Sequence, residues 1–355
     1  MPTLVRSLPA TLRHWLRPLL DPYRRYRLAR YLHAARVMAG LMATIALSLY
    51  FDLPHAEWVS VTMLIVVGGL QHQGNIRRKA LERAYGTLIG AGLGLLVVAQ
   101  QMYVGQPILT YGLMALFGGF FAYHAIGKGG YTALLSAITL FIVAGHGFNP
   151  LTDGLWRTVG IGIGIVMALV ISFAFPLYAV FSWRFGLAAG MLDCAKLHGR
   201  ILHGQSVTSD EHRRLSASAM RTLLQLRGLL PWVAKEVKIS TSGLEFLQGH
   251  LRTCISSLEM LANLRPAGLD EQTLLSLQQA LSGEHRQIRR HLISMARALR
   301  TGKIERLQRP LPAVIPSSVE LPASLAGYAM MTRYLTTSLD EFHSALAACA
   351  ERWNI

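Results

Sequence analysis

The sequence is poor in charged residues and in cysteine. Only 15% of its 355 residues are Asp, Glu, Lys or Arg, whereas 52% are hydrophobic and the mean hydropathy is +0.35. Soluble globular chains carry about 25% charged residues, so the composition excludes an average soluble protein. Three cysteines without a CxxC pair argue against a disulfide framework and for a reducing compartment. They are Cys194, Cys254 and Cys349.

Catalytic and metal-binding motifs are also missing. The sequence has no GxSxG, HExxH or paired CxxC motif, and GKGG at 127–130 lacks the upstream glycine and the Ser or Thr of a P-loop. His250 and Cys254 stand four residues apart and could share a metal, but without a third ligand nearby a packed thiol beside a surface histidine is the simpler interpretation. We therefore predict no catalytic residue, no metal, no cofactor and no enzyme activity.

Acidic residues are scarce relative to basic ones. Thirty-five Lys and Arg against nineteen Asp and Glu give a net charge of +16, which suits either nucleic acid or the anionic face of a membrane. Residues 1–180 hold fourteen of the basic residues but only five of the acids, together with twenty-one of the thirty-two glycines. Beyond residue 180 basic and acidic residues are mixed, without aromatic residues interleaved among the basic ones. We therefore expect no nucleic-acid partner.

The N-terminal half contains six apolar stretches with little or no charge. A helix that crosses ~30 Å of hydrocarbon needs about 20 mostly apolar residues. We place six spans at about 34–51, 58–70, 84–99, 108–126, 131–145 and 158–180. These apolar stretches predict that the N-terminal half lies in a lipid bilayer. Several of them are short for a full crossing, so their boundaries are approximate.

The connections between these stretches alternate in charge. Basic residues precede the first span, separate the second from the third, occur as Lys128 in AIGKGG, and return after the sixth span. The other three connections carry no Lys or Arg except Arg157, which is the one basic residue on the wrong side. Because short cytoplasmic loops carry the Lys and Arg of membrane proteins, both termini are predicted to be cytoplasmic.

Residues 1–33 form a basic leader before the first span. More than thirty residues precede the apolar run, so we expect no cleaved signal. Leucines at every fourth position from Leu4 to Leu20, among arginines, predict an amphipathic helix on the inner leaflet. A solvated basic tail is the alternative.

Small residues repeat every fourth position in the third and sixth spans. Such spacing places them on one face of a helix and lets two helix backbones approach closely. We therefore predict that these spans pack inside a bundle or at a dimer contact. The residues are Gly86, Gly90 and Gly94 in the third span, and Gly160, Gly164 and Ala168 in the sixth.

From residue 181 onward the pattern changes to helical heptads. Three apolar stripes run through 244–261, 277–299 and 335–353. They predict an antiparallel bundle of four or five helices that begins as a continuation of the sixth span. The predicted fold is all-α, with a leader (1–33), a six-span transmembrane helical bundle (34–180) and a cytosolic antiparallel helical bundle (181–355).

Ionisable residues gather where the third span begins. Groups of this kind at membrane depth are costly and usually face a cavity or pathway, and a cationic mouth concentrates anions. The alternative is that the arginines only orient the chain and extend to headgroups. The predicted substrate pathway comprises Arg77, Arg78, Lys79, Glu82, Arg83, Thr87, Lys128 and Arg157, and the predicted proton-coupling residues are Glu82, His124 and His146.

These segments resemble a known family. WVSVTMLIVVGG at 58–69, GNIRRKALERAYGTLIGAGLGLL at 74–96, GKGGYTALLSAITLFIVAG at 127–145 and LWRTVGIGIGIVMALVISFAFP at 155–176 are similar to the fusaric-acid-resistance and aromatic-acid-exporter family of bacterial inner-membrane proteins. The most specific piece is R-x-x-G-T-x-x-G, here Arg83, Gly86, Thr87 and Gly90.

The resemblance implies export of aromatic carboxylates or similar organic anions, driven by the proton gradient. It also implies a periplasmic membrane-fusion adaptor as a partner, as some family members have. Full-length exporters carry two membrane bundles, so a single bundle would have to form a homodimer. A dimeric anion channel is the second interpretation, because plant malate channels share a similar layout, and a non-transporting scaffold whose cytosolic bundle recruits a partner is the third.

Overall fold

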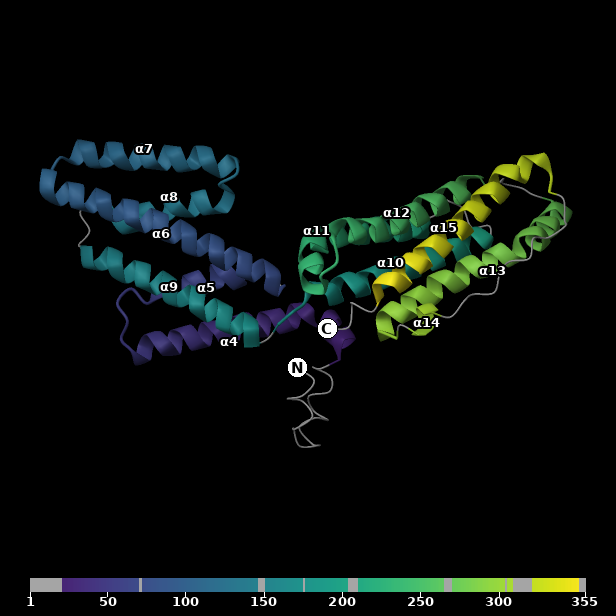
Figure 1. Cartoon of the computed structure of the whole chain (residues 1–355), viewed down its shortest axis with the longest axis horizontal. Helices are drawn as coiled ribbons and strands as arrows, with labels where there is room; N and C mark the ends of the chain where they lie inside the picture. The colour runs from purple at the N-terminus through teal and green to yellow at the C-terminus, as the bar shows by residue number, and fades with distance from the viewer. Residues whose placement is uncertain are drawn as a thin grey trace, which may run out of the picture. The chain divides into compact units, whose positions relative to one another are not determined.

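The computed structural model describes residues 21–69, 72–145, 151–174, 176–203, 210–264, 270–303, 305–308 and 321–350. Every described segment of regular structure is helical, which confirms the predicted all-α fold (Figure 1). The backbone divides into two compact units at Arg27 and Tyr178. We call Arg27–Tyr178 the membrane unit, and the described residues before and after it the C-terminal unit.

The membrane unit consists of six apolar helices, drawn from purple to teal in Figure 1. They are α4 (Ala29–Tyr50), α5 (Glu57–Val67), α6 (Gln73–Val104), α7 (Pro107–Ile126), α8 (Gly130–Ala144) and α9 (Leu151–Ala174). Among the described residues, four of them, α4, α6, α7 and α9, are long and apolar enough to cross a membrane. The other two, α5 and α8, have 11 and 15 residues. At about 1.5 Å per residue they are shorter than the ~30 Å of a hydrocarbon core.

The glycines of α6 lie against α8. A Cβ atom on Gly86 would stand 2.6 Å from Leu135 Cβ, and one on Gly94 would stand 2.9 Å from Val143 Cβ. Each contact is closer than two carbon atoms can approach, so only glycine permits this crossing. The contacts advance along both helices in the same direction, so α6 and α8 run parallel.

The glycines of α9 lie against α5 in a similar way. A Cβ atom on Gly164 would stand 2.8 Å from Thr62 Cβ, and one on Gly160 would stand 3.4 Å from Trp58 Cβ. Both glycine-faced helices therefore pack against the short helices of the bundle.

Two predicted boundaries of the membrane helices were wrong. The third helix begins at Gln73 rather than near residue 84, because the apolar run marks the lipid-facing part of a helix and not its first turn. The sixth helix was expected to continue into the C-terminal bundle, but α9 ends at Ala174 and the next helix begins at Ala179. Pro176 lies between them; proline lacks a backbone N–H and disfavours helical geometry in the residue before it.

The described part of the predicted leader includes the short helix α3 (Pro22–Arg27). Its Tyr23 and Tyr26 rings lie 5.3 Å from the Phe185 ring, and the Arg300 guanidinium lies 4.5 Å from the Tyr23 ring centroid. These contacts place α3 in the C-terminal unit. The predicted amphipathic helix at residues 4–20 lies outside the described residues.

The C-terminal unit is a helical bundle, whose helices from α10 onward are drawn from teal to yellow in Figure 1. It contains α10 (Ala179–Leu202), α11 (Asp210–Val237), α12 (Thr241–Leu264), α13 (Glu271–Thr301), α14 (Glu305–Gln308), a 3-10 turn η1 (Ala323–Leu325) and α15 (Ala326–Ala350). Helix α10 packs against α11, α12 and α13, and α15 packs against α12 and α13. The described members of the three predicted stripes are buried, from Leu244 to Leu261, Leu277 to Leu299 and Leu335 to Leu346. This confirms the heptad interpretation for the described residues.

A pair of histidines lies inside this bundle. His198 of α10 and His285 of α13 are both buried, with 3.1 Å between His198 Nε2 and His285 Nδ1. Burial, with smaller contributions from His285 and Arg289, lowers the pKa of His198 from 6.5 to about 3. The folded chain therefore keeps His198 neutral, since burial disfavours the charged imidazolium and a second imidazole lies beside it.

We predict that the size of the residue at Gly90 and Gly164 limits stability. Gly90→Ala and Gly164→Ala place a methyl group against Thr139 and Thr62 and should each cost about 1–3 kcal/mol. Their matched controls, Gly92→Ala and Gly162→Ala, change glycines with open space around the added Cβ atom and should melt like the wild type. Thermal unfolding of the four purified variants in detergent tests this prediction. If each variant melted at the same temperature as its matched control, the close packing of the helices at Gly90 and Gly164 would be contradicted.

Acid should destabilise the C-terminal unit through His198. Between pH 6.5 and about 3 the unfolded chain binds a proton on His198 that the folded chain does not, so stability falls as pH falls through this window. Lowering the pH from 7.5 to 5.5 should remove about 1.4 kcal/mol through this group. His198→Gln should flatten the dependence of melting temperature on pH, whereas the exposed His203→Gln should retain the wild-type slope.

Candidate functional site

The candidate site lies where α6 and α8 begin. Arg83, on the third turn of α6, is buried with only 2% of its surface exposed. Its guanidinium interacts electrostatically with Tyr131, the second residue of α8. The contact of Gly86 with Leu135 holds the two helices close enough for this interaction. The site is thus built by the close packing of α6 on α8.

Two polar atoms of this site have no hydrogen-bond partner among the described residues. They are Arg83 Nε and Thr87 Oγ1, both buried. Arg83 and Thr87 are four residues apart, so they lie on one face of α6. Among the described residues no carboxylate forms an ion pair with Arg83. A buried charged N–H without a partner costs about 1–3 kcal/mol or more, so an anion placed here would stabilise the folded protein.

The other basic residues at the start of α6 are held by neighbours. Arg78 Nε lies 2.7 Å from Glu82 Oε1 in an ion pair. Lys79 Nζ lies 2.9 Å from the centroid of the Tyr131 ring, and the Arg77 guanidinium lies 5.1 Å from the Phe173 ring of α9. Cation–π contacts of this kind fix a positive charge without neutralising it. The surroundings of Arg83 therefore stay cationic.

Four of the predicted residues do not join this cluster. Lys128 and His124 are exposed at the turn between α7 and α8. Arg157, half-buried near the start of α9, donates from Nη1 to the Ile142 carbonyl oxygen at 2.7 Å, close to the far end of α8. His146 lies outside the described residues. The structure thus brings together Arg77, Arg78, Lys79, Glu82, Arg83 and Thr87.

Sequence reasoning missed Tyr131. Its ring contacts Lys79 and its side chain interacts electrostatically with Arg83, so it connects two predicted residues. The alternating charge of the connections could have predicted this residue. It implies that the third and fifth spans begin on the same side of the membrane. The first polar residue of the fifth span is then expected at the depth of Arg83. The GKGGYT segment marks that position.

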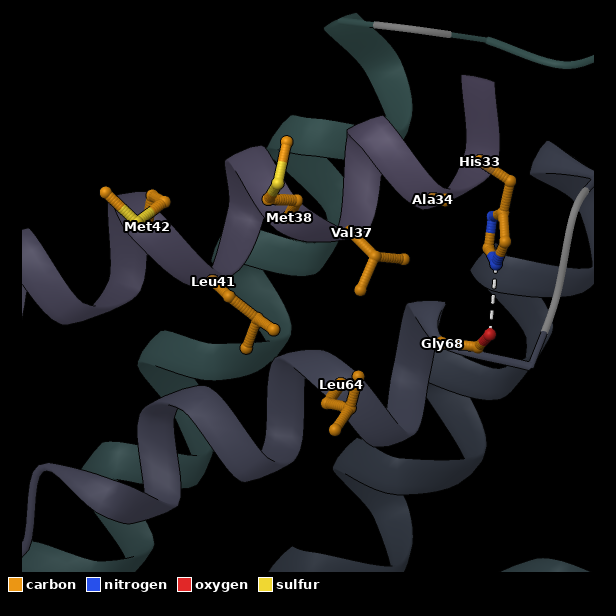
Figure 2. A pocket seen from close by; sticks show the side chains of 8 residues that line it. All are labelled: His33, Ala34, Val37, Met38, Leu41, Met42, Leu64 and Gly68. Atoms are coloured by element: carbon orange, nitrogen blue, oxygen red, sulfur yellow. Dashed lines mark hydrogen bonds between the residues drawn. The ribbon is translucent and has the colours of Figure 1, made fainter. Parts of the chain in front are cut away.

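A separate groove of about 570 Å³ lies between α4 and α5 (Figure 2). Figure 2 shows Val37 and Leu41 of α4 pointing toward Leu64 of α5, with Met38 and Met42 on the outer side of α4. The polar residues at one end of the groove already form hydrogen bonds with each other or with the backbone. His33 Nε2 donates to the Gly68 carbonyl oxygen at 3.0 Å, and Arg36 Nη2 lies 2.8 Å from His33 Nδ1.

This groove suits an apolar occupant. Aliphatic and thioether side chains line it, and Met38 and Met42 are more than half exposed at its opening. Methionine side chains adapt to irregular apolar shapes. The groove therefore fits an acyl chain or an aromatic ring, while the anion-binding chemistry lies at Arg83. The only sequence signal for this groove is an apolar pattern at helical spacing, formed by Val37, Met38, Leu41 and Met42.

The cluster at Arg83 can bind a carboxylate. A guanidinium presents N–H donors in a planar fork that matches the two oxygens of a carboxylate, and hydroxyl groups can complete the coordination. Thr87, four residues after Arg83 on α6, and Tyr131 of α8 each carry a hydroxyl group, and Thr87 Oγ1 is buried without a hydrogen-bond partner among the described residues. The arrangement offers positioning and charge, and the described residues around it include no nucleophile paired with a general base.

The chain is similar to two known bacterial proteins and matches one family model. The chain is 28% identical over 291 residues to "Inner membrane protein YeeA" of Escherichia coli K12, covering 80% of both chains. It is 27% identical over 162 residues to "p-hydroxybenzoic acid efflux pump subunit AaeB" of Escherichia fergusonii, covering 40% of this chain and only 24% of that longer protein. The family model of the fusaric acid resistance proteins matches residues 30–353. The chain therefore belongs to the fusaric acid resistance protein family.

Proposed function

We propose that this protein is a secondary transporter that exports aromatic carboxylates or related organic anions across the bacterial inner membrane. The observation that carries the proposal is the buried guanidinium of Arg83, whose Nε has no partner and whose neighbour Thr87 also offers a free polar atom. A buried cation that lacks a carboxylate partner among the described residues is suited to bind a carboxylate from outside the chain.

The aromatic part of the substrate has two sources of support. Tyr131 contributes a ring as well as a hydroxyl beside Arg83, and rings pack favourably against other rings. The printed name of one relative describes a p-hydroxybenzoic acid efflux pump subunit, and p-hydroxybenzoate is a small aromatic carboxylate. The other relative is named an inner membrane protein, which supports the proposed location.

The direction of transport follows from the proposed orientation. The connections rich in Lys and Arg lie at the start of α6 and before α4, so this end of the membrane unit is assigned to the cytoplasm. Both termini and the C-terminal unit are then cytoplasmic. Arg83 stands near the cytoplasmic mouth, where a cationic cluster would attract anions before they enter the bundle.

Proton coupling is assigned to Glu82. Its carboxylate is ion-paired with Arg78 and lies next to Arg83 in sequence, so protonation would release Arg78 and add positive charge to the mouth. His124 and His146 were proposed from sequence as further proton carriers; His124 is exposed beside the α7–α8 turn. No nucleotide-binding motif occurs in the sequence, which favours an ion gradient over hydrolysis of a nucleotide.

We further propose that the protein works as a homodimer with a periplasmic membrane-fusion adaptor, and that it has no enzyme activity. The chain carries one membrane unit and aligns with about a quarter of the longer efflux subunit. Two copies would then supply two bundles. An adaptor would carry the substrate across the periplasm.

Arg83→Gln should reduce export of p-hydroxybenzoate at least about tenfold, because it removes a charged hydrogen-bond donor worth about 1.5–3 kcal/mol. Tyr131→Phe, which keeps the ring but removes the hydroxyl, should have a smaller effect in the same direction. Uptake of labelled substrate by inside-out vesicles measures both.

The exposed Arg227→Gln in the C-terminal unit is the matched control and should transport like the wild type. Unchanged flux in Arg83→Gln would remove this residue from the pathway. Two results for the wild type would contradict the exporter itself. One is current under voltage without dependence on a pH gradient, which indicates a channel; the other is absence of flux together with a stable protein complex on the C-terminal unit, which indicates a scaffold.

Glu82→Gln should abolish the stimulation of export by a pH gradient. Exchange of substrate across the vesicle membrane, measured without a pH gradient, should be unchanged. The amide keeps the size of the carboxylate but can neither take up a proton nor form the ion pair with Arg78. Vesicles with and without an imposed pH gradient test this, with the exposed Glu245→Gln as control. A variant that still responds fully to the gradient would exclude Glu82 as the coupling residue.

A further inference from the structure

The six membrane helices pack as two equivalent sets of three. In the first set α4 precedes the short α5 and the long α6; in the second α7 precedes the short α8 and the long α9. The short helix of each set packs on the long helix of the other, so that α5 lies on α9 and α8 lies on α6. The two long helices also pack on each other. Exchanging the two sets leaves this pattern of contacts unchanged.

The equivalence extends to individual residues. Each long helix carries an arginine followed three residues later by a glycine and four residues after that by a second glycine. The two series are Arg83, Gly86, Gly90 and Arg157, Gly160, Gly164. In the next position of the four-residue spacing the first series has Gly94 and the second has Ala168.

The middle of each crossing also has the same chemistry. Gly90 lies against Thr139 of α8, with 2.7 Å from an added Cβ atom to Thr139 Cβ, and Gly164 lies against Thr62 of α5 at 2.8 Å. Both threonines are fully buried, and the hydroxyl of each lacks a hydrogen-bond partner among the described residues. A matching pair of buried unpaired hydroxyls is costly and is not explained by packing alone.

The two sets run in opposite directions. Gly154, near the start of α9, lies beside Val143 at the end of α8 and Leu95 in the second half of α6. Arg157 donates a hydrogen bond to the Ile142 carbonyl oxygen, whereas Arg83 interacts electrostatically with Tyr131. Eleven residues of α8 separate those contacts, which is about 16 Å along the helix. Arg83 and Arg157 therefore stand at opposite ends of the same helix.

We propose that the membrane unit is an inverted repeat, and that Arg157 is the counterpart of Arg83 that contacts the anion at the opposite, periplasmic mouth. This inference rests on the proposed function. Like Arg83, Arg157 has a buried Nε without a partner among the described residues. Half-length or interrupted helices at corresponding positions of two inverted halves mark substrate sites in transporters, and α5 and α8 occupy such positions.

The repeat explains why Arg157 breaks the charge pattern of the connections. A basic residue is unfavourable on the side of the membrane that lacks Lys and Arg, so orientation alone would not retain it. An anion carried from Arg83 past Thr87 and the two glycine crossings needs a cationic contact where it leaves. Arg157 supplies that contact, and its bond to the Ile142 carbonyl leaves the rest of the guanidinium available.

The first experiment tests the inverted repeat without any transport assay. Cys194 and Cys254 are buried, so Cys349→Ser gives a background that a membrane-impermeant maleimide should not label. In this background Thr152→Cys, before Arg157, should be labelled in intact spheroplasts, whereas Arg78→Cys, before Arg83, should be labelled only after permeabilisation. Labelling of both from the same side would overturn the repeat.

The second experiment tests the role of Arg157 by sidedness. Counterflow of p-hydroxybenzoate is measured in proteoliposomes with substrate varied on one face at a time. Arg157→Gln should raise the half-saturating concentration on the periplasmic face about ten- to hundredfold and leave the cytoplasmic face within about threefold. Arg83→Gln should do the reverse. Thr158→Ser, which retains its bond to the Gly154 carbonyl, is the matched control.

Arg157→Lys keeps the charge but not the planar fork, so it should give an intermediate half-saturating concentration if Arg157→Gln does not fold. Wild-type affinity on both faces for a folded Arg157 variant would overturn its role while leaving the exporter intact. Absence of counterflow in the wild type would overturn the proposed function and with it the role of Arg157. The labelling result would still decide the repeat.

Discussion

The close approach of α6 to α8 through glycine is the constraint on which the candidate site depends. With any larger residue at Gly86 the two helices would separate, and Arg83 could no longer reach Tyr131. A guanidinium can remain buried in an apolar bundle only if most of its N–H groups find partners, because lipid offers none. The glycine crossing therefore sets both the packing of the bundle and the position of its buried charge.

The same constraint operates at the other crossing, between α9 and α5. Gly164 admits α5 about as closely as Gly90 admits α8, and in both long helices an arginine precedes the pair of glycines. In both places a short helix packs against a long one, and the polar side chains of Thr62 and Thr139 on the short helices are buried inside the bundle. Close packing and buried polarity thus occur together, and a transporter needs both to offer a site within the membrane.

The C-terminal unit follows ordinary rules for a helical bundle. Its heptad stripes, such as Leu244 to Leu261, could be read from the sequence because apolar periodicity alone decides which helix face is buried. The histidine pair inside it could not, since His198 and His285 are 87 residues apart in the chain. Only the packing of α10 against α13 brings the two rings together and buries His198, which keeps it neutral.

The sequence by itself determined the all-α fold, the approximate places of the apolar helices and the basic cluster before the third of them. These depend on local hydropathy and charge, which a single chain carries along its length. The sequence also identified Arg83 and the four-residue spacing of the glycines, but not the residues of other helices that they contact. Tertiary structure decided that Tyr131 completes the site, that the apolar groove lies between α4 and α5, and that Arg157 stands at the far end of α8. Each of these is a contact between two different helices, and such contacts follow from how helix faces and helix ends meet, which no local pattern specifies.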